Sequence, residues 1–190
     1  LDVPAGDGSA GFYYVRQLPG TSTLELRVLD SDEVIWTQDG FNLAAQSVYI
    51  SGDVVYIPTD QGWLAVTTGG DMSQLGAAVG YTYDLSLDPY NGQVAYVADG
   101  GDVYVAPASD PSAASVVGNI GSNGGFAWTP YGIAIASGSQ VTIGGITVIE
   151  NGGDLTSPIW NGSGLEVADA SDGGAARIIT DAEIQQALSQ

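Results

Sequence analysis

The sequence predicts an all-β protein, because short segments rich in Val, Ile and Tyr recur along its 190 residues between turns of Gly, Asp and Asn. Two segments, residues 54–66 and 94–105, share one layout: a strand pattern, a short Gly-containing turn and a second strand pattern. Tyr14, Tyr56 and Tyr96 occupy corresponding places and set a period of about 40 residues, the length of one four-stranded blade. Such a strand pair needs neighbours to cover its faces. We therefore predict a β-propeller of about five short blades, either closed or open and incomplete.

The individual strands are predicted where apolar runs alternate with Gly, Pro, Asn and Asp. Residues 1–10, which contain Pro4 and two glycines, are expected to form an irregular lead-in, and residues 11–179 the propeller repeats. A first unit without its inner strand fits a ring that both termini close together. Asn91-Gly92 is the strongest hairpin signal in the chain. The predicted strands cover residues 12–18, 23–29, 34–37, 47–50, 54–58, 63–67, 74–79, 84–87, 93–98, 102–106, 115–120, 125–129, 133–136, 140–143, 147–150, 157–160, 165–168 and 176–179.

A short helix and tail are predicted at residues 180–190. Thr180 and Glu183 have the spacing of a capping box, in which each side chain accepts a hydrogen bond from the backbone amide at the other position. Ile184 and Leu188 then fall on one face, as an amphipathic helix requires.

The charge balance is unusual, because 22 acidic residues stand against three arginines, with no lysine and no histidine, for a formal net charge of −19. Nucleic acids and anionic lipid surfaces are bound through Lys and Arg, so neither is an expected partner. The absence of cysteine excludes disulfide and thiolate chemistry, and the absence of histidine removes the commonest general base. No apolar run is long enough to cross a membrane, so we expect no direct membrane insertion.

A second repeat places a tryptophan four residues before a glycine that opens an apolar strand. Residues 125–136 (GFAWTPYGIAIA) and 157–168 (SPIWNGSGLEVA) share this layout, with Trp128 and Trp160 in equivalent positions. The layout resembles the TolB-type propeller repeat. Residues 87–97 (LDPYNGQVAYV) fit it too, and also resemble the NHL and YVTN repeats. The last unit is most similar to the propeller domain of the actinobacterial LpqB lipoproteins, which implies an accessory lipoprotein that modulates a membrane sensor kinase.

The four tryptophans fall into two groups. Trp128 and Trp160 are expected to be buried, because an aromatic ring fills the wedge between adjacent sheets. Trp36 and Trp63 lie outside that layout, and Trp63 follows a Gln-Gly turn and alternates with a small residue, so it can face solvent. Together with Tyr90, these two are the candidate residues for contact with a partner.

We predict no catalytic residues and therefore not an enzyme. The carboxylates that a glycosidase would need stand mostly at strand ends beside glycines, where Asp commonly stabilises turns. These candidates are Asp84, Asp88, Asp99, Asp102, Glu150 and Glu166. No cofactor or metal is predicted either. Ca²⁺ is the alternative at residues 30–33 (DSDE) and 169–173 (DASDG), but neither segment has the spacing of a calcium loop.

The leading functional hypothesis is a non-enzymatic, extracytoplasmic module that binds a protein partner. The chain begins at Leu1 rather than Met, so we expect an upstream segment to have been removed, and the Gly- and Ser-rich, Lys-free composition suggests an extracellular or cell-surface protein. Two alternatives remain open. One is a structural or assembly protein of a virion or surface filament, completed by a neighbouring subunit. The other is a glycan-binding, lectin-like propeller with repeated exposed aromatic residues.

Overall fold

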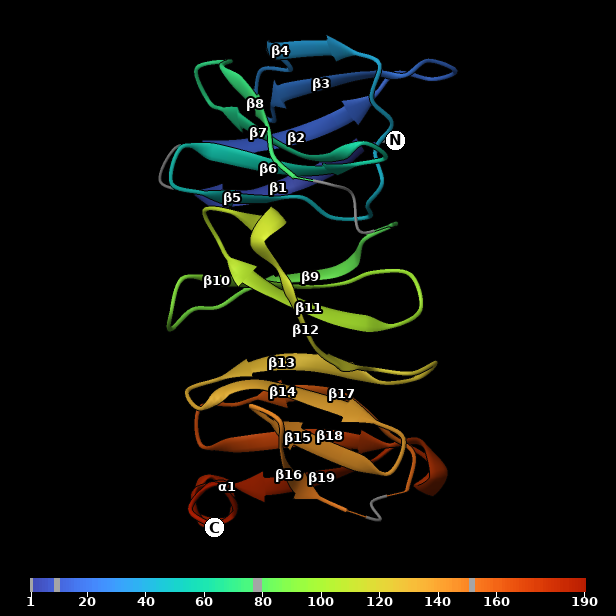
Figure 1. The fold of residues 1–190 in the computed structure, drawn as a ribbon, viewed down its shortest axis with the longest axis vertical. Coiled ribbons are helices and arrows are strands. Elements are labelled where there is room, and N and C mark those ends of the chain that lie inside the picture. The colour runs from blue at the N-terminus through green and yellow to red at the C-terminus, as the bar shows by residue number, and fades with distance from the viewer. Residues whose placement is uncertain (1, 9–10, 77–79, 151–152) are drawn as a thin grey trace. The chain divides into compact units, whose positions relative to one another are not determined.

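The computed structural model describes residues 2–8, 11–76, 80–150 and 153–190, and this part of the chain is mostly β (Figure 1). Its strands form five antiparallel sheets, as the five predicted blades require, and each sheet contains only strands that are consecutive in the chain. Among the described helices, none has the length and apolar character needed to cross a bilayer. The chain divides into two compact units, the first made of residues 1–87, 92–99 and 104–115 and the second of residues 88–91, 100–103 and 116–190.

The first sheet corrects the prediction for the N-terminus. Residues 1–10 were expected to be irregular, but Asp2–Gly8 form an edge strand in which Pro4 pairs with Tyr14. Proline is tolerated in edge strands, where half of the backbone groups need no ladder partner. Because β1 gives the first sheet four strands, the expectation that the first unit lacks its inner strand is also wrong. The sheet runs in the order β1 (Asp2–Gly8), β2 (Gly11–Gln17), β3 (Thr23–Val28) and β4 (Val34–Asp39).

The inner strands of the second sheet are buried on both of their faces. Strand β6 reads Val-Val-Tyr-Ile-Pro-Thr, a continuous apolar run of the kind that two covered faces require. The predicted strand at 74–79 begins earlier, at Met72, and residues 77–79 lie outside the described part of the chain. The sheet runs in the order β5 (Tyr49–Ser51), β6 (Val54–Thr59), β7 (Gly62–Thr67) and β8 (Met72–Gln74).

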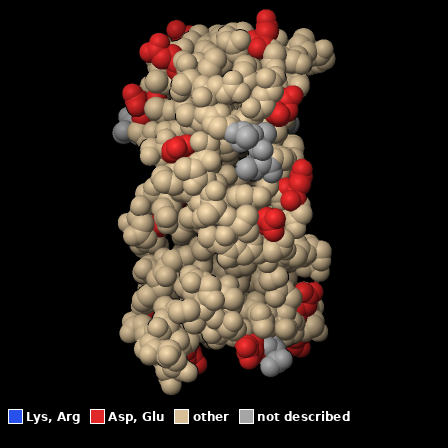
Figure 2. Space-filling model, viewed as in Figure 1, with Lys and Arg blue, Asp and Glu red and all other residues tan. Residues whose placement is uncertain are grey.

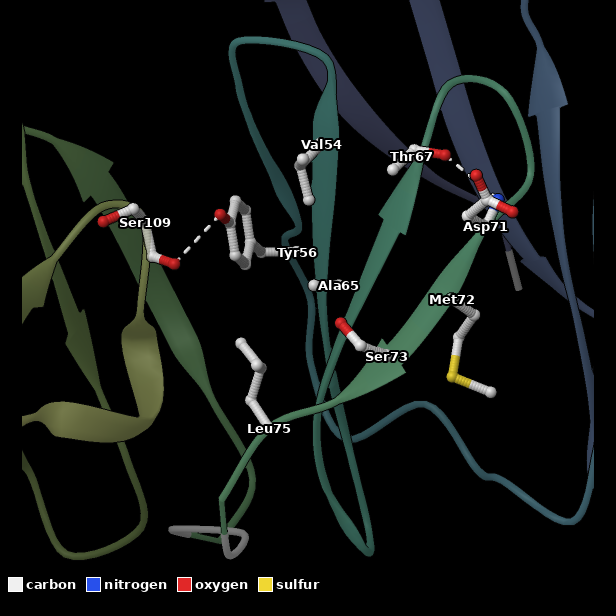
Figure 3. Close-up of a pocket in the computed structure, with 9 residues that line it drawn as sticks. All are labelled: Val54, Tyr56, Ala65, Thr67, Asp71, Met72, Ser73, Leu75 and Ser109. Carbon is white, nitrogen blue, oxygen red and sulfur yellow. Dashed lines mark hydrogen bonds between the residues drawn. The ribbon is translucent and has the colours of Figure 1, made fainter.

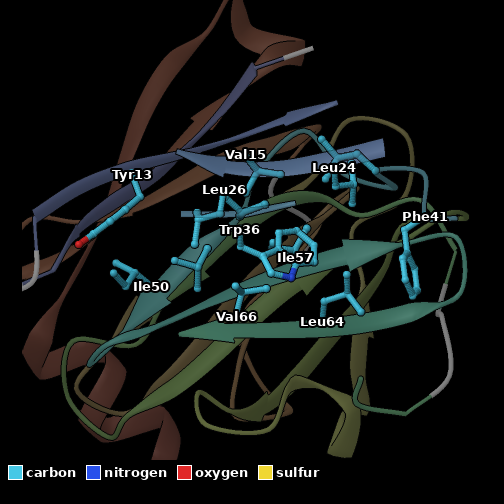
Figure 4. Close-up of a cluster of buried hydrophobic side chains, with 13 residues drawn as sticks. Tyr13, Val15, Leu24, Leu26, Trp36, Phe41, Ile50, Ile57, Leu64 and Val66 are labelled. Carbon is cyan, nitrogen blue, oxygen red and sulfur yellow. The ribbon is translucent and has the colours of Figure 1, made fainter. Parts of the chain in front are cut away.

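One face of the second sheet packs against the first sheet and forms a core of interdigitated side chains (Figure 4). Val15 and Leu26 from the first sheet and Ile57 and Leu64 from the second are fully buried there. The opposite face carries a second cluster, named here the Trp63 cluster. Its buried members are Tyr49, Tyr56, Trp63, Val94, Tyr96, Ala106 and Ala108.

The third sheet contains residues of both units. Asn91-Gly92 lies in the turn between its first two strands, and Gly92 has a φ of +66°, which favours glycine and agrees with the predicted hairpin. Tyr14, Tyr56 and Tyr96 lie in β2, β6 and β10, each the second strand of its sheet, so the proposed period is confirmed. The sheet comprises β9 (Tyr83–Leu87), β10 (Gln93–Val97), β11 (Asp102–Pro107) and β12 (Ser115–Asn119).

The fourth and fifth sheets belong to the second unit and share the tryptophan repeat in the same register. Trp128 pairs with Ile133, and Trp160 pairs with Leu165, so the two residues are structurally equivalent. The fourth sheet comprises β13 (Gly125–Thr129), β14 (Gly132–Ser137), β15 (Gln140–Ile143) and β16 (Ile146–Ile149). The fifth comprises β17 (Leu155–Trp160), β18 (Gly164–Asp169) and β19 (Ala175–Thr180).

The C-terminal core lies between these two sheets and includes Leu155, Leu165, Ile179 and Ile184. Ile184 belongs to helix α1 (Asp181–Leu188), which begins with the predicted capping box at Thr180. Trp128 is buried, as expected, whereas Trp160 is only partly buried at the margin of the core.

Both units contain a turn with the same pair of hydrogen bonds from a threonine hydroxyl. The hydroxyl of Thr59 donates to the carbonyl of Gly62 at 2.6 Å and accepts the amide two residues after Thr59. Thr129 makes the same pair of bonds with Gly132 at 2.7 Å and with the amide two residues on. Both glycines have φ values near the edge of the left-handed region, +124° and +115°, where a Cβ atom is strained. The Thr-x-x-Gly pattern therefore specifies the turn that opens each following strand.

Candidate functional site

A groove of about 320 Å³ lies on the second sheet, beside the Trp63 cluster (Figure 3). Strand register places Tyr56, Ala65 and Ser73 in one row across β6, β7 and β8. Because Ala65 and Ser73 are small, the surface falls away from the Tyr56 ring and leaves a hollow toward the sheet edge. The other residues that line the groove are Val54, Thr67, Asp71, Met72, Leu75 and Ser109.

Hydrogen bonds from two tyrosines hold one wall of the groove. The Tyr56 hydroxyl donates to the carbonyl oxygen of Ser109 at 3.1 Å, and the Tyr49 hydroxyl donates to that of Ala108 at 2.9 Å. The two rings are stacked, with centroids 4.8 Å apart. Burial raises the pKa of both phenols, so both remain neutral donors at physiological pH. The wall is therefore fixed and does not titrate.

The opposite end of the groove is polar and acidic. Thr67 donates its amide to the carbonyl of Asp71 at 2.8 Å, and its hydroxyl accepts the amide of Asp71 at 3.0 Å, which fixes the turn before β8. Asp71 brings a carboxylate to the end of an otherwise apolar hollow. Met72, with 37% of its surface exposed, forms the adjacent rim. This arrangement suits an apolar side chain next to a cationic group.

The edge of the second sheet beside the groove is open. Leu75 donates its amide to the carbonyl of Trp63 at 2.8 Å, which fixes the alternation of hydrogen-bonded pairs between β7 and β8. Met72 and Gln74 therefore lie at the positions whose N–H and C=O groups point away from β7. Within the described residues, these groups have no backbone partner. A further strand can pair with them.

The structure corrects two of the three predicted partner-contact residues. Trp63 is only 1% exposed, with its ring centroid 5.3 Å from that of Tyr96, because β7 is an inner strand covered on both faces. Trp36 is 8% exposed and belongs to the core between the first and second sheets. Tyr90 is 47% exposed in the β9–β10 turn, so contact between Tyr90 and a partner stays a prediction. Alternation within a strand did not show which strands have two covered faces.

Several of the carboxylates considered for catalysis accept hydrogen bonds from other groups of the protein. Asp88 accepts the amide of Tyr90 at 2.8 Å, and Asp99 accepts that of Tyr81 at 3.1 Å. Glu166 accepts from the side chain of Asn161 at 2.6 Å. The Asp88 contact, with the amide two residues on, is typical of a turn-stabilising aspartate. The groove itself contains one carboxylate and no partner acid or base among its lining residues.

In both segments weighed as calcium sites, a carboxylate has partners within the protein. The Asp32 carboxylate accepts the Tyr14 hydroxyl and pairs with the Arg27 guanidinium at 3.1 Å, and both contacts hold its pKa below the usual 3.8. Asp169 accepts the amide of Ser171 at 3.0 Å and the hydroxyl of the same residue at 2.6 Å. In the described part of the chain, no group of three or more acidic side chains has the geometry of a metal site. Figure 2 shows acidic side chains dispersed over one face of the molecule rather than gathered in one patch.

Solved structures with a similar fold are propellers that share little sequence with this chain. It is 20% identical to Sqt1 of Chaetomium thermophilum, solved bound to the N-terminus of ribosomal protein L10, with a TM-score of 0.55 over 94% of this chain and 56% of that one. The N-terminal domain of Nup159 is 12% identical, with a TM-score of 0.55 over 95% of this chain and 61% of that one. BamB of Moraxella catarrhalis is 12% identical, with a TM-score of 0.51 over 93% of this chain and 57% of that one.

No protein-family model and no curated protein sequence matches the chain. The chain spans little more than half the length of these three structures. At such low identity the similarity concerns the fold alone. The fold is therefore an all-β propeller fold, as the sequence predicted.

Proposed function

We propose that the protein is a non-enzymatic module that binds another protein through the groove of the second sheet. The single observation that carries this proposal is the groove itself, an apolar hollow with Asp71 at its end and the open edge of β8 beside it. An extended partner segment can pair its backbone with Met72 and Gln74 and insert one apolar side chain over Ala65. Strand addition supplies affinity through the backbone, and the hollow supplies specificity.

The expected partner segment carries Lys or Arg next to its apolar anchor. The net charge of −19 attracts cationic partners over a distance, and the Asp71 carboxylate attracts one locally. The solved complex of Sqt1 with the N-terminus of ribosomal protein L10 shows that a protein of this fold class binds a protein segment. That precedent supports the class of function and leaves the partner to be found.

The proposals for location and pathway rest on the sequence features alone. We propose an extracellular or cell-surface position, supported by the Lys-free, Gly-rich composition, and a role beside a membrane sensor kinase, supported by the TolB-type and LpqB-like repeats. Fractionation of the source cells with an antibody against the protein tests the location. A protein recovered only with the cytoplasmic fraction would contradict it.

A peptide selection tests the groove. Random ten-residue peptides displayed on phage are selected on the intact protein, and the binders are compared on Ala65→Phe, which fills the hollow, and on Asp71→Asn, which removes the charge. We expect Ala65→Phe to abolish binding and Asp71→Asn to weaken it about tenfold for peptides with Lys or Arg. Phe12→Ala is the matched control, because it truncates an exposed aromatic residue that does not line the groove. Selected peptides that bind Ala65→Phe as well as the parent protein would refute the proposal.

A further inference from the structure

The fifth sheet has three strands, whereas each of the other four has four within the described residues. Its order is β17-β18-β19, so β19 is an edge strand where each other sheet continues to a fourth strand. Helix α1 begins directly after β19, at Asp181, and its N-cap occupies only the Thr180 end of that edge. The remaining edge, along residues 175–179, lies outside this N-cap.

The hydrogen-bond register shows which backbone groups of β19 point outward. Asp181 donates its amide to the carbonyl of Ser163 at 3.1 Å, so these two residues continue the β18–β19 ladder as a hydrogen-bonded pair. Counted from this pair, every second residue pair of the ladder is also hydrogen-bonded. Ala176 and Ile178 lie at the alternate positions, so their N–H and C=O groups face away from β18. Thr180 is in the same phase, and its outward amide donates to Glu183 at 2.8 Å. Within the described residues, Ala176 and Ile178 have no such partner.

A cavity of about 410 Å³ adjoins this edge. It lies between the outer strand β16, which contributes Val148 and Ile149, and β19, which contributes residues 177–179. Glu150 and Glu183 also line it, so two carboxylates stand against the one guanidinium of Arg177. The space beside β19 is therefore open and carries an excess of negative charge.

The face of the fifth sheet opposite the C-terminal core exposes two isoleucines, one on either side of Glu166. Ile159, Glu166 and Ile178 form one row across the sheet, because Ile159 pairs with Glu166 and Glu166 with Ile178. Ile159 is 60% exposed and Ile178 is 62% exposed. A strand added beside β19 places every second side chain on this face, next to Ile178, and the intervening ones toward the cavity.

We infer that β19 accepts a β-strand from a partner protein, which completes the fifth sheet. The incoming segment is extended, with an apolar residue at every second position to cover Ile178 and a Lys or Arg between them to meet Glu150 and Glu183. Backbone bonds to Ala176 and Ile178 fix its register. This surface is independent of the groove on the second sheet, since no residue lines both.

A designed peptide tests the inference on the intact protein. The probe is the capped peptide Lys-Val-Thr-Val-Lys-Val-Thr, and its charge-reversed control has Glu in place of both lysines. We expect saturating probe to slow amide exchange at Ala176 and Ile178 at least about tenfold, and the Glu peptide to bind at least about tenfold more weakly.

Two variants distinguish strand pairing from non-specific binding of the probe. Ala176→Pro removes an outward N–H without removing a bond to β18, so it should weaken binding of the probe at least about tenfold. Ala176→Gly keeps the amide and should bind as the parent protein does. Far-UV circular dichroism verifies that both variants remain folded.

Three outcomes would overturn the inference. One is the absence of protection at Ala176 and Ile178 with millimolar probe. Another is protection at Met72 and Gln74 instead, which would assign strand binding to the groove edge of the second sheet. The third is a concentration-dependent dimer that Ala176→Pro dissociates, because the occupant would then be a second copy of this chain.

Discussion

The second and fifth sheets are built alike but differ in how many of their faces are covered. In the second sheet, Leu64 faces the core shared with the first sheet and Trp63 faces the opposite cluster, and neither is more than 1% exposed. In the fifth sheet, Leu165 is buried in the C-terminal core, while Ile159 and Ile178 on the other face are about 60% exposed. An apolar strand residue is thus core or surface according to what covers its face.

The difference is visible in the strand sequences. Residues 54–58 (VVYIP) are apolar throughout, which suits an inner strand with two covered faces. Residues 164–169 (GLEVAD) alternate between apolar and polar or small side chains, which suits a strand with one covered face. The comparison teaches that the two faces of a strand need to be judged separately. The following predictions test it.

Trp63→Ala should have the largest effect. The side chain is fully buried between Tyr49 and Tyr96, so its loss leaves a cavity in the Trp63 cluster and should lower the free energy of unfolding by about 3–5 kcal/mol. Urea unfolding followed by far-UV circular dichroism measures the change. Trp63→Phe, which keeps an aromatic ring, should cost less than Trp63→Ala. Equal stability of Trp63→Ala and the parent protein would show that the second face is not covered.

Trp128 and Trp160 should differ in spite of their equivalent register. Trp128 is 7% exposed, so Trp128→Ala should cost about 3–4 kcal/mol. Trp160 is only partly buried and meets the Tyr131 ring at a centroid distance of 6.2 Å, so Trp160→Ala should cost about 1–2 kcal/mol. Both values come from urea unfolding under one set of conditions. A larger loss for Trp160→Ala would contradict the placement of Trp160 at the margin of the C-terminal core.

The neighbours Ile178 and Ile179 offer a sharper contrast within one strand. Ile179→Ala should destabilise the protein by about 2–4 kcal/mol, because Ile179 is 6% exposed within the C-terminal core. Ile178→Ala should stay within about 0.5 kcal/mol of the parent protein, because Ile178 projects from the uncovered face. Each variant serves as the control for the other. Similar losses in both would mean that the second face is covered in solution.

The smallest expected effect concerns acid stability at the first sheet. The Tyr14 hydroxyl, and then Arg27, lower the pKa of Asp32 below 3.8, so the folded state binds a proton there less readily than the unfolded state does. The resulting stabilisation is present above that ordinary value and is lost as the pH falls through the lowered one. Asp32→Asn should therefore flatten the decline of the unfolding free energy at acid pH. An unchanged slope would show that the Tyr14–Asp32–Arg27 contacts do not form in solution.

Much of the fold was predictable because its turns are specified locally. Gly92 and the glycines at the starts of β7, β14 and β18 mark strand boundaries to within a residue or two. β1 was missed because Pro4 argues against a strand unless the strand lies at an edge, which only the sheet order reveals. Sequence pattern thus located the strands better than it located their neighbours.

The groove was not predictable, because it arises from contacts between strands rather than along one. Ala65 and Ser73 create the hollow only because register places them side by side next to Tyr56. Trp63 was misjudged for the same reason, since its exposure depends on the cluster over β7. A useful signal was available in the continuous apolar run of β6, which indicates that the inner strands of the second sheet are covered on both faces.

Each sheet consists of strands that are consecutive in the chain, which affects the order in which the sheets can fold during synthesis. Every paired strand in the described sheets is bonded to a neighbour in sequence, so the hydrogen-bond ladders close over short loops. Local pairings of this kind form quickly, and domains assemble from the N-terminus as the chain leaves the ribosome. The first sheet can therefore pair its strands before the last is synthesised. The fifth sheet is synthesised after the other four, and α1 follows it in the chain.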